Sequence, residues 1–153
     1  MPSLLHNGRI LVDDAFHEGL ALVVEGDRIA ALGPEAALRA AFPEAAAHDL
    51  NDDRLVPGYI DTQVNGGGGV LFNDAPTAET IARIGAAHRR LGTTGFLPTL
   101  IRGGLSVIDR AIDAVEQAMA DGVPGVLGIH IEGPFLNVAR KGIHDPTKFR
   151  TLD

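Results

Sequence analysis

The pattern of apolar and polar residues after position 57 changes repeatedly between a period of two and a helical period. Alternating residues predict strands over 59–65, 93–100 and 126–132. Between them, apolar positions three or four apart predict one helix over 77–91 and a second from 106 to about 121. This β-α-β-α-β order is typical of a parallel sheet with helices outside it, and periodicity leaves open whether the sheet is open or closed.

Both predicted helices have recognisable start signals. Thr77 is expected to cap the first, and Ser106, with Asp109 three residues later, has the form of a capping box for the second. The second helix is expected to bury one apolar face, formed by Ile108, Ile112, Val115 and Met119.

The first 56 residues have a different pattern of short apolar runs separated by turns. Strands are predicted over 8–11, 20–24 and 28–32, the last two as a hairpin. An Ala-rich stretch over 34–42 predicts one short helix, with Pro34 in its first turn. We therefore expect a small β-rich domain at residues 1–56, followed at 57–153 by the first units of a β/α fold.

Composition narrows the class of protein. The hydrophobic content of 45% and the charged content of 22% are those of a soluble globular protein. A net charge of −7 argues against a nucleic-acid-binding surface and leaves small molecules or copies of the same chain as expected partners. Without cysteine, any metal must be bound by His, Asp, Glu or amide oxygens. No signal peptide or long apolar span is evident, so we expect no membrane association and a cytoplasmic location.

The strand over 126–132 carries the strongest chemical signal. Side chains alternate along a strand, so His130 and Glu132 are expected on one face together with Val126. Leu127, Ile129 and Ile131 are expected on the opposite face, against the helices. Glu132 would stand at the carboxyl end of a parallel strand, where such folds gather ligands and catalytic groups.

The strand over 59–65 repeats this arrangement. Asp61, Gln63 and Asn65 are expected on one face, with Ile60 and Val64 on the other. Two strands would then bring polar side chains to one inner face. Burying them costs several kcal/mol unless they bond each other, a metal or a substrate.

Residue types alone leave other interpretations open. Glu132 could be solvated, His130 a hydrogen-bonded interior residue, and His144 a surface residue. The glycines at 66–69 could form a flexible turn or allow a ligand to approach closely. They are no phosphate loop, because no Gly-Lys-Ser/Thr follows them.

Several motifs resemble one enzyme family. Leu55-Val56-Pro57-Gly58-Tyr59-Ile60-Asp61 resembles the start of the barrel in the amidohydrolase superfamily. Gln63-Val64-Asn65-Gly66 then stands where most members have His-x-His, a substitution similar to that of the N-acetylglucosamine-6-phosphate deacetylases. Further similar stretches are Gly69–Asp74, Leu97-Pro98-Thr99-Leu100, Gly128–Asn137 and Lys141-Gly142-Ile143-His144.

The resemblance implies specific roles for these residues. Glu132 would be a metal ligand, and Gln63 and Asn65 would neighbour the metal in place of the missing histidines. His144 would contact the substrate acetamide and polarise its carbonyl, and Asn137 would also contact the substrate. The cofactor would be a divalent metal, with zinc expected and iron or manganese also compatible.

The reaction that the resemblance implies is hydrolysis of N-acetylglucosamine 6-phosphate to glucosamine 6-phosphate and acetate. The implied fold is a TIM-like (β/α)8 barrel in a homodimeric parent enzyme. A complete barrel needs roughly 250 residues, so this chain is expected to supply its first three strands and to be inactive and aggregation-prone alone. In the family, two metal-binding histidines and a catalytic aspartate come from later strands.

Two rival hypotheses stay open at this point. One is another amidohydrolase, such as an N-acetylgalactosamine-6-phosphate deacetylase, which these motifs do not separate from the glucosamine enzyme. The other is a non-catalytic binding or assembly domain, which would fold cooperatively by itself.

Overall fold

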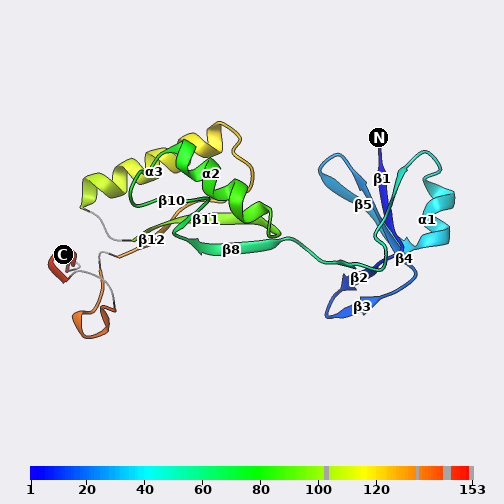
Figure 1. Cartoon of the computed structure of the whole chain (residues 1–153), viewed down its shortest axis with the longest axis horizontal. Helices are drawn as coiled ribbons and strands as arrows, with labels where there is room; N and C mark the ends of the chain where they lie inside the picture. Colours follow the sequence, from blue (N-terminus) through cyan, green and yellow to red (C-terminus); the bar gives the residue numbers. More distant parts are fainter. Residues whose placement is uncertain (102–103, 134, 143–145, 152–153) are drawn as a thin grey trace. The chain divides into compact units, whose positions relative to one another are not determined.

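A computed structural model describes residues 1–101, 104–133, 135–142 and 146–151. The chain divides into two compact units, Met1–Pro57 and Gly58–Asp153 (Figure 1). Across the described part of the chain, no helix is both long enough and apolar enough to cross a membrane.

The first unit is built mainly from short strands. Its elements are β1 (Ser3–His6), β2 (Arg9–Val12), β3 (Ala15–His17), β4 (Leu20–Glu25), β5 (Arg28–Pro34), α1 (Glu35–Ala41), β6 (Ala46–Asp49) and β7 (Arg54–Leu55). They form one sheet of order β5-β4-β1-β6 and a second of order β3-β2-β7. The predicted hairpin is confirmed as the antiparallel pair β4–β5.

A small core holds this unit together. Leu4, Ala21 and Val23 are buried, and Leu38 and Phe42 pack against them from α1 and its C-terminal end. The sequence did not predict β3 and β6, because every residue in these two strands is exposed and no apolar alternation marks them. Helix α1 begins at Glu35, one residue later than predicted, since Pro34 still belongs to β5.

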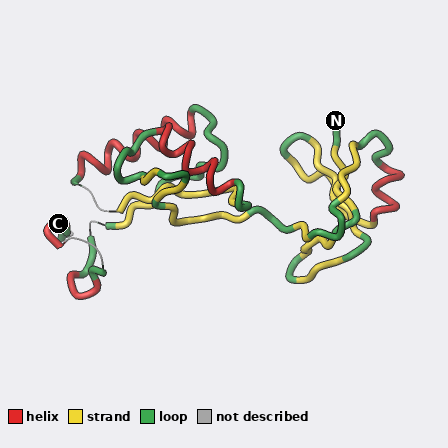
Figure 2. Tube along the Cα trace, viewed as in Figure 1, coloured by secondary structure: helices red, strands yellow, loops and turns green. Residues whose placement is uncertain are grey.

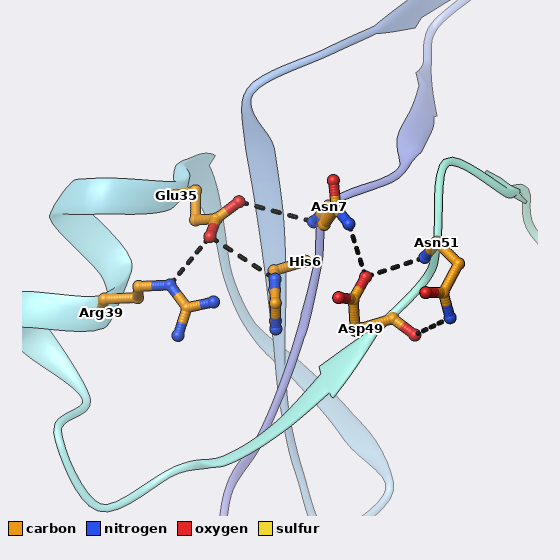
Figure 3. Close-up of polar contacts among 6 residues, drawn as sticks. All are labelled: His6, Asn7, Glu35, Arg39, Asp49 and Asn51. Carbon is orange, nitrogen blue, oxygen red and sulfur yellow. Dashed lines mark hydrogen bonds and ion pairs between the residues drawn. The ribbon is translucent and has the colours of Figure 1, made fainter.

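Two carboxylates, Glu35 and Asp49, make polar contacts near the C-terminal end of β1 (Figure 3). Glu35 accepts a 2.8 Å hydrogen bond from Arg39 Nε, and Asp49 accepts bonds from the backbone N–H of Asn51 and from Asn7 Nδ2 at 2.8 and 2.6 Å. His6 Nδ1 lies 3.5 Å from Glu35 Oε1, close enough for an ion pair when the ring is protonated but outside hydrogen-bond geometry.

These contacts predict an acid-sensitive first unit. The hydrogen bond from Arg39 lowers the pKa of Glu35 below its ordinary 4.5, and the Asn51 N–H lowers the pKa of Asp49 below its ordinary 3.8. Because both pKa values are lower in the folded state, the stabilisation is complete above the ordinary values and is lost as the pH falls below them. Chemical denaturation of the protein between pH 7 and pH 3 should show this loss.

Single substitutions test the cause of this pH dependence. Glu35→Gln and Asp49→Asn should each make the decline in the free energy of unfolding shallower, and Glu44→Gln controls for removing an exposed carboxylate. If the free energy of unfolding falls equally steeply with pH in wild type and in both variants, Glu35 and Asp49 are not the cause of the acid sensitivity.

The second unit contains the predicted β-α-β-α-β order. Its elements are β8 (Tyr59–Val64), β9 (Gly66–Gly67), β10 (Val70–Leu71), α2 (Ala78–Arg89), β11 (Thr93–Ile101), α3 (Leu105–Ala120), β12 (His130–Glu132) and 3-10 turns at Val138–Arg140 and Pro146–Lys148. Strands β8, β11 and β12 form a parallel sheet of order β12-β11-β8. Figure 2 shows α2 and α3 along one side of these strands.

The core of this unit lies between the sheet and the two helices. It contains Val64, Phe72, Ile81, Ile84, Phe96, Leu100, Ala111, Ala114, Val115, Ala118 and Val126. Thr77 caps α2 as predicted, with its hydroxyl accepting from the backbone N–H of Thr80 at 3.2 Å.

One prediction about α3 is wrong, and the predicted buried face is confirmed only for Val115, which is buried in the core, and Ile108, which packs against it. The helix begins at Leu105 after Gly104, without a side-chain cap, so Ser106 lies inside its first turn. Its buried face is Ala111, Ala114, Val115 and Ala118, and Met119 is 49% exposed. Small alanine side chains allow close packing of α3, and they gave no strong apolar signal in the sequence.

The predicted alternation in β8 is interrupted by a bulge. Phe96 and Pro98 of β11 pair with Asp61 and Val64, so β8 has one extra residue between the two pairs. Paired residues share a face, so Asp61 lies on the helix-facing side with Val64, not with Gln63 as predicted. Asp61 Oδ1 accepts a 3.0 Å bond from the backbone N–H of Gln63 at this irregularity.

The region over 126–129 also departs from the predicted strand, since β12 begins only at His130. Val126 is buried in the helix-facing core, and Ile129 packs against the same core, three residues later. Leu127 lies on the other face, where it would contact a side chain at Gly95. Gly128, with φ of +148°, lies between these positions and breaks the alternation.

Candidate functional site

The two polar side chains that the sequence singled out on separate strands are in contact. Gln63 Nε2 donates a hydrogen bond to Glu132 Oε2 at 3.1 Å, although β11 separates β8 from β12. Glu132 is the last residue of β12 and is half-buried. The contact therefore lies at the carboxyl end of the parallel strands, on the face opposite the helix-facing core.

His130 has a hydrogen-bonded interior position beside this pair. Its Nδ1 lies 3.2 Å from Oγ1 of Thr99, which is fully buried. The Thr99 hydroxyl donates its single proton to the carbonyl oxygen of Leu97 at 3.2 Å. Of the two ring nitrogens of His130, Nδ1 is therefore the one that contacts Thr99.

Asn65 provides an uncommitted polar group just past β8. Its Nδ2 is buried and has no hydrogen-bond partner among the described residues. Its backbone carbonyl accepts from the N–H of Phe72 at 2.9 Å, which closes the loop between them. A buried amide donor without a partner is costly, so this site suits a water or a ligand oxygen.

Helix α2 holds the glycine-rich loop that follows Asn65. His88 Nε2 lies 2.9 Å from the carbonyl oxygen of Gly66, and Arg83 Nε donates to that of Gly68 at 2.8 Å. A side chain at Gly67 would have its Cβ 2.9 Å from the His88 ring. Close packing against α2 explains this glycine, rather than the free turn or the ligand contact considered from sequence.

The remaining predicted site residues are Asn137 and His144. Asn137 Oδ1 accepts from the backbone N–H of Ala139 at 2.9 Å and caps the 3-10 turn at Val138–Arg140. His144 lies outside the described residues. Substrate contact by Asn137 and His144 stays a prediction.

Sequence reasoning missed Asn73, which appeared only as part of a motif. Its side-chain amide donates to the carbonyl oxygen of Ile101 at 2.6 Å and accepts from the N–H of the same residue at 2.7 Å. Ile101 is paired with Glu132 in the sheet. Apart from that motif, the sequence shows only an Asn within the loop predicted between the glycines and Thr77, which is too common a feature to single out.

The chemistry of these donors is compatible with part of a metal site. Glu132 supplies one anionic oxygen ligand of the kind that divalent cations bind. Within the described ranges, no three His, Cys, Asp or Glu side chains come together in a group that could hold a metal. Glu132 therefore fits as one ligand, and further donors would have to come from elsewhere.

Comparison with known proteins connects the chain to one group of enzymes. It is 52% identical over 103 residues to an N-acetylgalactosamine-6-phosphate deacetylase from Shewanella sp. (strain ANA-3), covering 67% of this chain and 26% of the relative. It is 35% identical over 132 residues to an N-acetylglucosamine-6-phosphate deacetylase from Haemophilus influenzae, covering 86% of this chain and 34% of the relative. A family model described as an imidazolonepropionase-like composite domain of bacteria matches residues 21–45.

Comparison of the fold with solved structures also connects the chain to these deacetylases. The crystal structure of N-acetylglucosamine-6-phosphate deacetylase from Pasteurella multocida superposes with a TM-score of 0.92 and 31% identity, covering 100% of this chain and 40% of that one. The chain thus spans from about a quarter to two fifths of the length of these relatives. By sequence and by fold, the chain is a homologue of the N-acetylglucosamine- and N-acetylgalactosamine-6-phosphate deacetylases, matching one part of their length.

Proposed function

We propose that residues 57–153 form the first three strands of a TIM-like (β/α)8 barrel and that residues 1–56 belong to a small β-rich domain of the same enzyme. The parallel order β12-β11-β8 with helices on one face supports this proposal, as does the superposition on the Pasteurella deacetylase. Cytoplasmic location and homodimeric assembly are parts of the same proposal.

We propose that the whole enzyme hydrolyses the N-acetyl group of N-acetylglucosamine 6-phosphate. The observation that carries this proposal is the contact between Gln63 and Glu132 at the carboxyl end of the strands. A carboxylate held at this end of a β/α fold lies where catalytic groups gather. The Shewanella, Haemophilus and Pasteurella relatives supply the class of substrate.

The residues of this chain would have distinct tasks in that reaction. Glu132 would be a ligand of the divalent metal, zinc being the first candidate and iron or manganese the others. When bound, such a metal lowers the pKa of a water molecule toward neutrality. Gln63 would orient Glu132 by its hydrogen bond, and Nδ2 of Asn65, which has no partner among the described residues, would donate to a water or ligand oxygen. His144 would donate to the acetamide oxygen as negative charge develops there.

The galactosamine epimer is a second candidate substrate. The Shewanella relative, which is named for that substrate, is 52% identical to this chain over the aligned residues. The two substrates differ only in the configuration of one hydroxyl group.

The test is acetate release by the full-length enzyme that contains this chain, supplied with zinc, iron or manganese. Both N-acetylhexosamine 6-phosphates and the unphosphorylated sugars should be compared under the same conditions. Turnover of the 6-phosphates, lost on metal removal, would support the proposal. A purified, metal-loaded enzyme that releases no acetate from either 6-phosphate would refute it.

His144→Ala is expected to lower kcat about a hundredfold while the enzyme keeps its metal. The reason is that the histidine is proposed to stabilise charge on the substrate oxygen, and removing one such donor has about this effect. Steady-state kinetics together with metal analysis of the purified variant would check this. Loss of the metal along with activity would instead make His144 a ligand.

A further inference from the structure

Strand β11 continues beyond the end of its neighbour β8. The last pair between them is Pro98 with Val64, after which the chain turns into the glycine loop. On its other edge, β11 still pairs with β12 as far as Ile101 and Glu132. Among the described residues, no strand therefore pairs with Ile101 on the edge that faces β8.

The side chain of Asn73 occupies the place of that missing strand. Its Nδ2 donates to the carbonyl oxygen of Ile101 at 2.6 Å, and its Oδ1 accepts from the N–H of Ile101 at 2.7 Å. A carboxamide has the same donor and acceptor as a peptide group, so one side chain replaces a peptide of the absent strand. Both bonds are short for N–H···O contacts.

The pair of hydrogen bonds between Asn73 and Ile101, here called the clamp, connects two parts of the candidate site. One part is the loop after Gln63 and Asn65, and the other is the strand end at Glu132. Asn73 follows Phe72, whose N–H binds the carbonyl oxygen of Asn65 and whose side chain is fully buried. On its other side, the clamp fixes Ile101, the residue paired with Glu132. The loop that follows Gln63 and Asn65 is thereby held to the strand end beside Glu132.

We propose that Asn73 is a positioning residue of the deacetylase reaction. By completing the edge of β11, it fixes the distance between the Gln63 and Asn65 amides and the Glu132 carboxylate. This inference rests on the proposed function. Asn73 need not touch the substrate, and its effect passes through the backbone of Ile101.

The effect of a positioning residue differs from that of a residue that only stabilises the fold. Misplacing a reacting group by about 1 Å can lower the rate about a hundredfold. Loss of a group that acts only in the transition state lowers kcat with little change in KM. Loss of fold stability instead reduces the amount of active enzyme and lowers the melting temperature.

The experiment compares Asn73→Ala and Asn73→Asp with wild type in the full-length, metal-loaded enzyme. The aspartate keeps the size and the acceptor but places an oxygen against the Ile101 carbonyl. Gln117→Ala is the matched control, because it removes a side-chain amide bonded to Asp121 on the exposed face of α3. For each protein, kcat, KM, bound metal and circular dichroism are measured at a temperature well below unfolding.

We expect both Asn73 variants to fold and to lose about tenfold or more in kcat per folded enzyme, with KM changed by less than about threefold. Gln117→Ala should match wild type. Wild-type kcat in either folded Asn73 variant would overturn the proposal, as would unfolding of both, which would make Asn73 a stability residue only. Inactive wild-type enzyme would contradict the proposed function instead, so the two failures are distinguishable.

Discussion

In the proposed full-length enzyme, Glu132→Ala is expected to remove bound metal and deacetylase activity together, lowering turnover by more than about a hundredfold. Substitutions of groups that only orient a metal ligand already reduce metal affinity or activity about 10–100-fold. Loss of the ligand itself should therefore have a larger effect. The structure supplies the reason for choosing this residue, because Glu132 ends β12 and accepts the hydrogen bond of Gln63.

Metal content per protomer and acetate release, measured on the same preparation, check this prediction. Glu116→Ala, which removes an exposed carboxylate from α3, controls for the change in charge. Glu132→Gln is informative beside it, since the amide keeps the size of the side chain but is a weaker ligand than a carboxylate. Full metal content in a folded Glu132→Ala protein would refute the ligand assignment.

Phe72→Ala is expected to lower the free energy of unfolding by about 3–5 kcal/mol. Phe72 is fully buried in the core between the sheet and helices α2 and α3. Its removal leaves a cavity that the surrounding residues can fill only in part, so the loss of packing adds to the loss of apolar burial. The loop between Asn65 and Asn73 depends on the same side chain for its anchor.

Chemical denaturation followed by circular dichroism measures this loss. Phe135→Ala is the matched control, because that ring is 55% exposed and its removal should change the free energy of unfolding by less than about 1 kcal/mol. Equal losses in the free energy of unfolding for the two substitutions would show that Phe72 does not stabilise the core of this unit more than an exposed ring does.

The order of elements in the second unit could be predicted from sequence because its signals are local. Apolar periodicity placed α2, β8 and β11 to within two residues, and the Thr77 cap is a short-range contact. Turn residues and alternating apolar positions likewise gave the hairpin β4–β5. The sequence motifs of the second unit also indicated the deacetylases, as the relatives confirm.

The prediction of side-chain faces from alternation was wrong where the backbone departs from regular strand geometry. The extra residue in β8 moved Asp61 to the helix-facing side, and Gly128 put Val126 and Ile129 on the same side. Both irregularities depend on how neighbouring strands pair. A single strand's sequence contains no information about the register of its partner.

The sequence by itself determined the polar residues that could take part in chemistry, namely Gln63, Asn65, His130 and Glu132, and the strands that carry them. Only the tertiary structure decided that Gln63 and Glu132 meet across β11, that His130 bonds Thr99, and that Asn73 completes the sheet edge. The physical reason is that these contacts join residues 28 to 69 positions apart. Periodicity reports which face a residue occupies within its own element, whereas such contacts are set by strand order and register.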